Sequence, residues 1–106
     1  MKLKEVRSSL YNAVVGYSFW CVACDSPHAF YTHDGYTNNK SWKLISTDPV
    51  TVQPSIKLTA PYKNETENYC CHLFLLNGKI RYLTDCTHYL AGKEIDMIDF
   101  PIPNFE

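Results

Sequence analysis

The hydrophobic residues of the chain fall in short runs separated by polar and turn-forming residues. Runs of this length are typical of β-strands rather than of amphipathic helices. The pattern predicts six strands, at residues 14–20, 28–33, 42–46, 70–76, 79–84 and 95–98. Asn77 and Gly78 separate the fourth and fifth of these strands, and this pair predicts a type I′ hairpin, in which both central residues need positive φ.

Two further segments predict irregular structure. Residues 50–59 contain Pro54, which indicates an edge strand, a bulge or an irregular entry to a strand. Residues 87–91 are consistent with a single helical turn that ends at Gly92. The sequence therefore predicts one mainly β domain over residues 1–106, built as a small antiparallel sheet of hairpins, with a zinc knuckle and at most one short helical turn. We expect residues 1–10 and 101–106 to be flexible ends.

Length and charge exclude several classes of protein. The chain has 106 residues and a formal net charge of −1, and its ten basic residues are scattered. This distribution predicts no nucleic-acid partner. There is no run of 18 apolar residues, so we expect no membrane span. The first 24 residues lack the uninterrupted apolar core and the cleavage site of a signal peptide, which favours a cytoplasmic location.

Cysteine and histidine are clustered in three short segments. The odd number of cysteines, five, does not fit a fully paired disulfide framework. Thiolates spaced as Cys-x-x-Cys and accompanied by histidine are typical of zinc sites in a reducing compartment. The chain thus predicts a Zn²⁺ site, and its candidate ligands are Cys21, Cys24, His28, Cys71, His72, Cys86 and His88.

The candidates outnumber the four ligands of a structural site. Cys21 and Cys24 form a tight Cys-Val-Ala-Cys turn that directs both sulfurs to one side. Cys71 and His72 are adjacent, and neighbouring side chains of a regular strand point to opposite faces, so joint binding needs a bulge. Cys86 is one residue removed from His88, a spacing that puts both on one face of an extended segment.

Asp85 precedes Cys86 and has two interpretations. It can act as a carboxylate base beside a metal-bound water, with His88 as a second catalytic candidate. Alternatively it caps the turn at Thr87 and His88 through their backbone amides, which is the commoner role of aspartate at such positions.

The order of these motifs resembles a family of small proteins of unknown function, many of them encoded by phages or prophages. The resemblance covers residues 19–100 and is carried by Cys21, Cys24 and His28, by Pro54-Ser55-Ile56, and by the long pattern from Cys71-His72 through Asp85-Cys86-Thr87-His88 to Gly92. An "ammonia monooxygenase" label attached to some members does not fit a small chain without membrane spans. The resemblance favours Cys21, Cys24, Cys71 and His72 as the zinc ligands, with Cys86, His88 and His28 as alternatives.

Three functions are compatible with these observations. The first is a zinc-stabilised, phage-type accessory protein without enzymatic activity, which binds a protein partner, such as a host factor, in the host cytoplasm. The second is a zinc-dependent hydrolase that uses Asp85, Cys86 and His88. The third is thiol redox chemistry or metal sensing. Sites with several thiolates are more often structural than catalytic, which favours the binding module.

Overall fold

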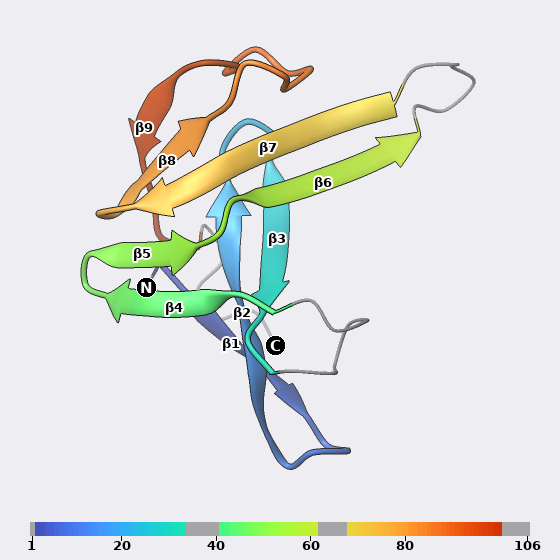
Figure 1. Ribbon diagram of the computed structural model, residues 1–106, viewed down its shortest axis with the longest axis vertical. Helices are drawn as coiled ribbons and strands as arrows, with labels where there is room; N and C mark the ends of the chain where they lie inside the picture. Colours follow the sequence, from blue (N-terminus) through green and yellow to red (C-terminus); the bar gives the residue numbers. More distant parts are fainter. Residues whose placement is uncertain (1, 34–40, 62–67, 101–106) are drawn as a thin grey trace.

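The protein is built from β-strands alone over the part of the chain that the structure, a computed structural model, describes, namely residues 2–33, 41–61 and 68–100. In these residues nine strands form three antiparallel sheets, and no helix is present (Figure 1). The predicted mainly β fold is confirmed.

The first sheet contains the predicted first hairpin and one further strand. Its order is β1 (Lys4–Ser8), β2 (Ala13–Cys21) and β3 (Ser26–Tyr31). Strand β1 lies within the segment that we expected to be a flexible end, and instead it pairs along β2, with a register shift after Val6. The turn between β2 and β3 holds the Cys-x-x-Cys segment, and Asp25 in this turn has a positive φ of 52°.

A four-stranded sheet carries Cys71 and His72. Its order is β6 (Ile56–Pro61), β7 (Asn68–Leu76), β8 (Lys79–Tyr82) and β9 (Glu94–Asp96). The predicted hairpin between β7 and β8 is confirmed, because Asn77 and Gly78 have φ values of 51° and 78°. Strand β6 lies at one edge of this sheet, beside β7 (Figure 1).

Pro54 separates two strands that belong to different sheets. Strand β5 (Val50–Gln53) pairs with β4 (Lys43–Thr47), whereas β6 begins at Ile56 and pairs with β7. Proline cannot donate to a strand ladder, so the switch occurs where a continuous strand would be interrupted. The short segment between β5 and β6 therefore carries Ser55 from one sheet to the next.

The helical turn predicted at residues 87–91 is not formed. The Thr87 amide donates to the Cys70 carbonyl at 3.0 Å, so this segment is tied to the start of β7. Two reverse-turn hydrogen bonds follow, from Ala91 to His88 and from Lys93 to Leu90. The expected flexible end at residues 101–106 lies outside the described residues.

The core is formed by the faces that the three sheets turn toward one another, and β7 crosses over β2 and β3 (Figure 1). The period of two in a strand accounts for its composition, because alternate residues are buried. Its fully buried side chains include Phe19, Phe30, Val52, Leu73, Leu75, Ile80 and Tyr82. Within the described residues there is no helix of the length and apolarity that a membrane span requires.

Gly16 of β2 occupies a position with no room for a side chain. A Cβ atom there would lie 2.4 Å from the Phe30 carbonyl oxygen and 2.9 Å from the Tyr31 Cα. Both neighbours are backbone atoms, so neither can rotate away. We expect Gly16→Ala to destabilise the protein by about 2 kcal/mol or more, measured by urea unfolding. Ser18→Ala, in the same strand, is the control and should change stability by less than about 0.5 kcal/mol.

Candidate active site and metal centre

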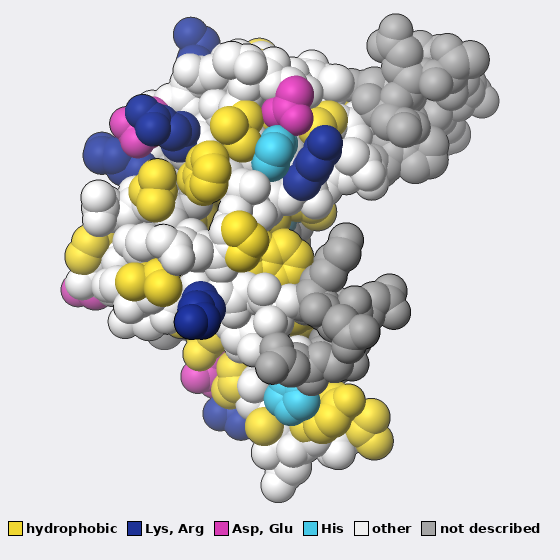
Figure 2. Space-filling view, viewed as in Figure 1, with side chains coloured by type: hydrophobic (Ala, Val, Ile, Leu, Met, Phe, Trp, Pro, Cys, Tyr) yellow, Lys and Arg dark blue, Asp and Glu magenta, His cyan; other side chains and the backbone are white. Residues whose placement is uncertain are grey.

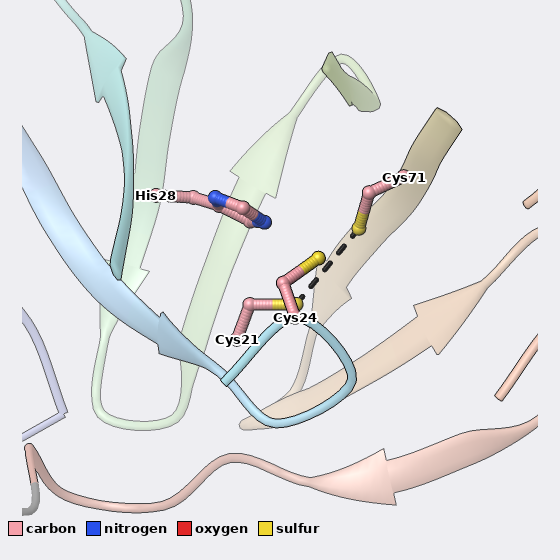
Figure 3. A group of neighbouring side chains, drawn as sticks. All are labelled: Cys21, Cys24, His28 and Cys71. Atoms are coloured by element: carbon pink, nitrogen blue, oxygen red, sulfur yellow. Dashed lines mark hydrogen bonds between the residues drawn. The ribbon is translucent and has the colours of Figure 1, made fainter. Parts of the chain in front are cut away.

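Four candidate ligands meet between the first hairpin and the middle of β7. Cys21 ends β2, Cys24 lies in the following turn, His28 is on β3 and Cys71 is on β7. Their ligand atoms all lie within 4.8 Å of one another. Figure 3 shows the three sulfurs and the imidazole pointing toward a common centre. The segments are far apart in sequence, and only the crossing of the sheets brings them together.

The geometry of this group fits a tetrahedral metal ion. Two thiolates that each lie about 2.3 Å from a tetrahedral ion are roughly 3.8 Å apart. The Cys21 and Cys71 sulfurs are separated by 3.8 Å. His28 Nε2 is buried and has no hydrogen-bond partner among the described residues, although a buried ring nitrogen normally has one. A metal ion held by three sulfurs and this nitrogen accounts for both observations.

Two tyrosine hydroxyls surround the sulfurs. Tyr82 Oη lies 3.2 Å from the Cys21 sulfur and accepts the Ala23 amide, and Tyr69 Oη lies 2.6 Å from the Cys24 sulfur. Hydrogen bonding to the Cys71 thiol lowers the pKa of Cys21 to about 3, whereas the same contact raises the pKa of Cys71. A thiolate is therefore favoured at this position, which is the form that binds metal.

His72 does not join this cluster, because it points to the other face of β7. Its Nε2 atom lies 3.0 Å from the Ser55 hydroxyl oxygen. Its Nδ1 atom lies 3.0 and 3.2 Å from the two carboxylate oxygens of Asp85. Serine, histidine and aspartate are thus linked in series, which is the arrangement of a nucleophile, a general base and the carboxylate that orients the base.

The charges around His72 favour this chain of hydrogen bonds. Its bond to His72 lowers the pKa of Asp85, and Lys57 lies 3.8 Å from the same carboxylate. An ionised Asp85 accepts a hydrogen bond from the Nδ1–H group of His72, so Nε2 carries no proton and accepts a hydrogen bond from the Ser55 hydroxyl. The His72 side chain is 23% exposed and that of Asp85 is 47% exposed, so a substrate can reach the site. Figure 2 shows a histidine flanked by acidic and basic side chains on this face.

Further hydrogen bonds hold the backbone of both serine and histidine. The Cys86 sulfur accepts the His72 amide at 3.2 Å, and the Cys86 thiol donates to the His72 carbonyl at 3.1 Å. The indole Nε1 of Trp42 donates to the Ser55 carbonyl at 3.1 Å. Asp85 and Cys86 therefore contact the same residue, one through its ring and the other through its main chain.

The remaining candidates lie outside both groups of side chains. His88 accepts the Leu90 amide on Nδ1 and packs edge-on against Tyr82 at a ring distance of 4.7 Å. It is not part of the group whose ligand atoms lie within 4.8 Å of one another, although its Nε2 atom, like that of His28, is buried without a hydrogen-bond partner among the described residues. Burial lowers the pKa of His88. The Thr87 amide donates to Cys70 rather than to Asp85, which differs from the capping role considered for that carboxylate.

Ser55 was not singled out as a functional residue by sequence reasoning. Serine is common in loops, and its partners are 17 residues and 30 residues further along the chain, at His72 and Asp85. The one signal was its place in the Pro54-Ser55-Ile56 motif. No periodicity or local spacing connects it with the other two residues.

An all-β domain with a Ser–His–Asp arrangement beside a Cys/His cluster has the features of a serine hydrolase that a metal can stabilise. Comparison with known families agrees with this class, because a family model described as "Bacterial ubiquitination-like system serine protease (BubE)" matches residues 3–83. The match covers more than half of the chain, and the chain belongs to this family. No curated protein and no solved structure matches it.

The family corrects the function that the sequence favoured. A non-enzymatic, zinc-stabilised binding module conflicts with a family described as serine proteases. The physical reason for the error is the adjacency of Cys71 and His72. We assigned both residues to the metal, and this left no base for a serine nucleophile.

The two possible histidine ligands can be separated by mutation. We expect His28→Ala to abolish metal binding at the Cys/His cluster, because it removes one of the four candidate ligands. His72→Ala should retain the ion, since its ring faces Ser55 and Asp85. The measurement is the metal content per chain of each purified variant, determined by elemental analysis. Metal loss in His72→Ala with retention in His28→Ala would reverse the assignment.

Proposed function

We propose that this protein is a serine peptidase in which Ser55 is the nucleophile, His72 the general base and Asp85 the residue that orients the base. The observation that carries the proposal is the continuous hydrogen-bonded series from the Ser55 hydroxyl through both ring nitrogens of His72 to Asp85. Membership of a family described as serine proteases supports the same chemistry.

The proposed reaction proceeds in two steps. As the Ser55 oxygen bonds to the scissile carbonyl carbon, His72 Nε2 takes the hydroxyl proton. The C–N bond then breaks, and the leaving amine takes that proton, which leaves an acyl ester on Ser55. A water molecule next gives a proton to His72 and attacks the ester, so that a carboxylic acid leaves and Ser55 recovers its hydroxyl proton. Asp85 stabilises the imidazolium formed in each step.

We further propose that Zn²⁺ occupies the cluster of Cys21, Cys24, His28 and Cys71 as a structural ion. Three thiolates and one imidazole are a common ligand set for structural zinc, and a closed set of four leaves no position for a reacting water. When bound, the ion crosslinks the first hairpin to β7. The residues of the chain itself carry out the chemistry, because His72 is held on the opposite face of β7.

The proposed setting follows from the family description and from the thiols. The family description names a serine protease of a bacterial ubiquitination-like system, and the substrate of a protease is a protein or peptide. All five cysteines are free of disulfides. Free thiols that bind a metal ion are typical of proteins in a reducing compartment. We therefore propose a cytoplasmic enzyme that acts on a protein substrate.

Covalent labelling of the nucleophile provides a direct test. A small fluorophosphonate should modify the wild-type protein once, at Ser55, as shown by intact-mass and peptide mass spectrometry. Ser55→Ala should give no labelling, because the attacked phosphorus has no nucleophile there. Asp85→Asn should slow labelling by roughly ten-thousandfold if the loss is as large as in other serine peptidases.

Asp96→Asn is the matched control for Asp85→Asn. It makes the same change at an exposed carboxylate that pairs with Lys79 on β8, away from His72, and it should label at the wild-type rate. Labelling that persists in Ser55→Ala at the wild-type rate would contradict the proposal.

The role of the metal can be tested by replacing it. We expect exchange of Zn²⁺ for Cd²⁺ to preserve the labelling rate within about twofold, because a structural ion needs only to hold its ligands. Complete removal by a chelator should lower the thermal midpoint and the labelling rate together, since the ion contributes to folding. A rate that collapses in the folded Cd²⁺ protein would indicate instead that the metal takes part in the chemistry.

A further inference from the structure

The free edge of β6 leads directly to Ser55, and its backbone is arranged to accept another strand. Among the described residues, strand β6 pairs with β7 on one side only, because it is the last strand of its sheet. In an antiparallel pair, alternate residues direct both their N–H and C=O groups toward the partner, and the residues between them direct both groups away. The hydrogen bonds of β7 reveal which residues of β6 point outward.

His72 and Cys70 of β7 direct their backbone groups away from β6. The His72 carbonyl accepts the Leu83 amide, and its amide bonds to Cys86, so both groups point to the β8 side. The Cys70 amide donates to the Thr87 hydroxyl, and its carbonyl accepts the Thr87 amide. The cross-strand partners of these two residues therefore form non-hydrogen-bonded pairs with β7.

Lys57 pairs with His72, and Thr59 pairs with Cys70. It follows that the amides and carbonyls of Lys57 and Thr59 both point outward, toward the free edge. No described residue forms a hydrogen bond with these two amides and two carbonyls. At the other end of the edge, the Ser55 carbonyl already accepts the Trp42 indole, so the open backbone begins at Lys57.

We propose that the substrate binds as an extended peptide that adds to the edge of β6, antiparallel to it, so that its acyl end reaches the Ser55 hydroxyl. This inference rests on the proposed peptidase function and specifies the form of its substrate. An antiparallel peptide runs from Thr59 toward Ser55, which places the residues before the scissile bond along the edge. Main-chain hydrogen bonds supply the affinity in this mode of recognition.

The register of this pairing follows from the spacing of the outward residues. Residues two apart in a strand are about 6.6 Å apart. With the residue that supplies the scissile carbonyl placed at Ser55 and counted as the first, the third residue pairs with Lys57 and the fifth with Thr59. The second and fourth residues turn their backbone groups away from β6 and make no such bonds.

The fourth residue of the substrate would lie opposite Leu58 and share its face of the sheet. A hollow of about 460 Å³ lies on that side, between β6 and the first hairpin, and its walls include Leu58 and Tyr69 together with Cys24 and His28 of the Cys/His cluster. Side chains opposite each other in paired strands point to the same face. The fourth side chain therefore lies on the face of the Cys/His cluster, beside this hollow, whereas the third and fifth side chains lie on the opposite face of the sheet.

Peptidyl diphenyl phosphonates of one, three and five alanine residues test the proposal, because their rate of attachment to Ser55 reports both binding and the nucleophile. We expect the rate to rise on reaching the third residue and again on reaching the fifth. N-methylation of the third amide should lower the rate roughly threefold to tenfold, the effect of one lost hydrogen bond. N-methylation of the fourth amide is the control and should leave the rate close to that of the parent probe.

A variant of the protein tests the same contact from the other side. Thr59→Pro removes an outward N–H without touching the ladder to β7, and it should abolish the gain from the fifth residue. Thr59→Ala keeps the amide and isolates the contribution of the side chain. A small fluorophosphonate confirms in each variant that Ser55 still reacts.

The outcomes separate the two proposals. Suppose that the fluorophosphonate labels Ser55, but that attachment of the peptidyl phosphonates does not depend on peptide length or responds equally to methylation of the third and fourth amides. This result would overturn binding at the β6 edge and leave the peptidase proposal intact. A lack of fluorophosphonate labelling in the folded wild-type protein would overturn both.

Discussion

The alternation of side chains at two adjacent residues of β7 is the constraint on which both sites depend. Cys71 points into the interior toward the Cys/His cluster, and His72 points outward toward Ser55 and Asp85. Because the side-chain period of a strand is two, a shift of one residue in the register of β7 would exchange these directions. A metal ion that fixes Cys71 against the first hairpin would therefore also fix the base on the other face.

The polar contacts around His72 show how a half-buried histidine is held in one orientation. Its ring is oriented by Asp85, and its main chain is held by Leu83 and Cys86. The consecutive residues Asp85 and Cys86 both contact His72: Asp85 contacts its ring, and Cys86 contacts its backbone. Such support lets a surface histidine keep one orientation without deep burial.

Local pattern predicted most of the strands and the type I′ turn, because hydrophobic period and turn chemistry act over a few residues, but it missed β1, which is held by its pairing with β2. Pro54 likewise indicated the break between β5 and β6. The choice between His28 and His72 at the metal depends on which face of β7 meets the first hairpin, and that is settled by the crossing of the sheets. The partnership of Ser55 with His72 spans two strands and was invisible for the same reason.

The separation of metal and nucleophile follows from the ligand count. A metal-dependent hydrolase needs an open coordination position for water, whereas Cys21, Cys24, His28 and Cys71 form a set of four. The proposed nucleophile, Ser55, lies on the opposite face of the sheet beside His72, which is not one of these four residues. Because Cys71 and His72 are consecutive residues, a change in the position of Cys71 on loss of a metal ion would also move the backbone of His72. The proposed structural site and the proposed catalytic site would therefore be coupled through the backbone of β7, although they share no side chain.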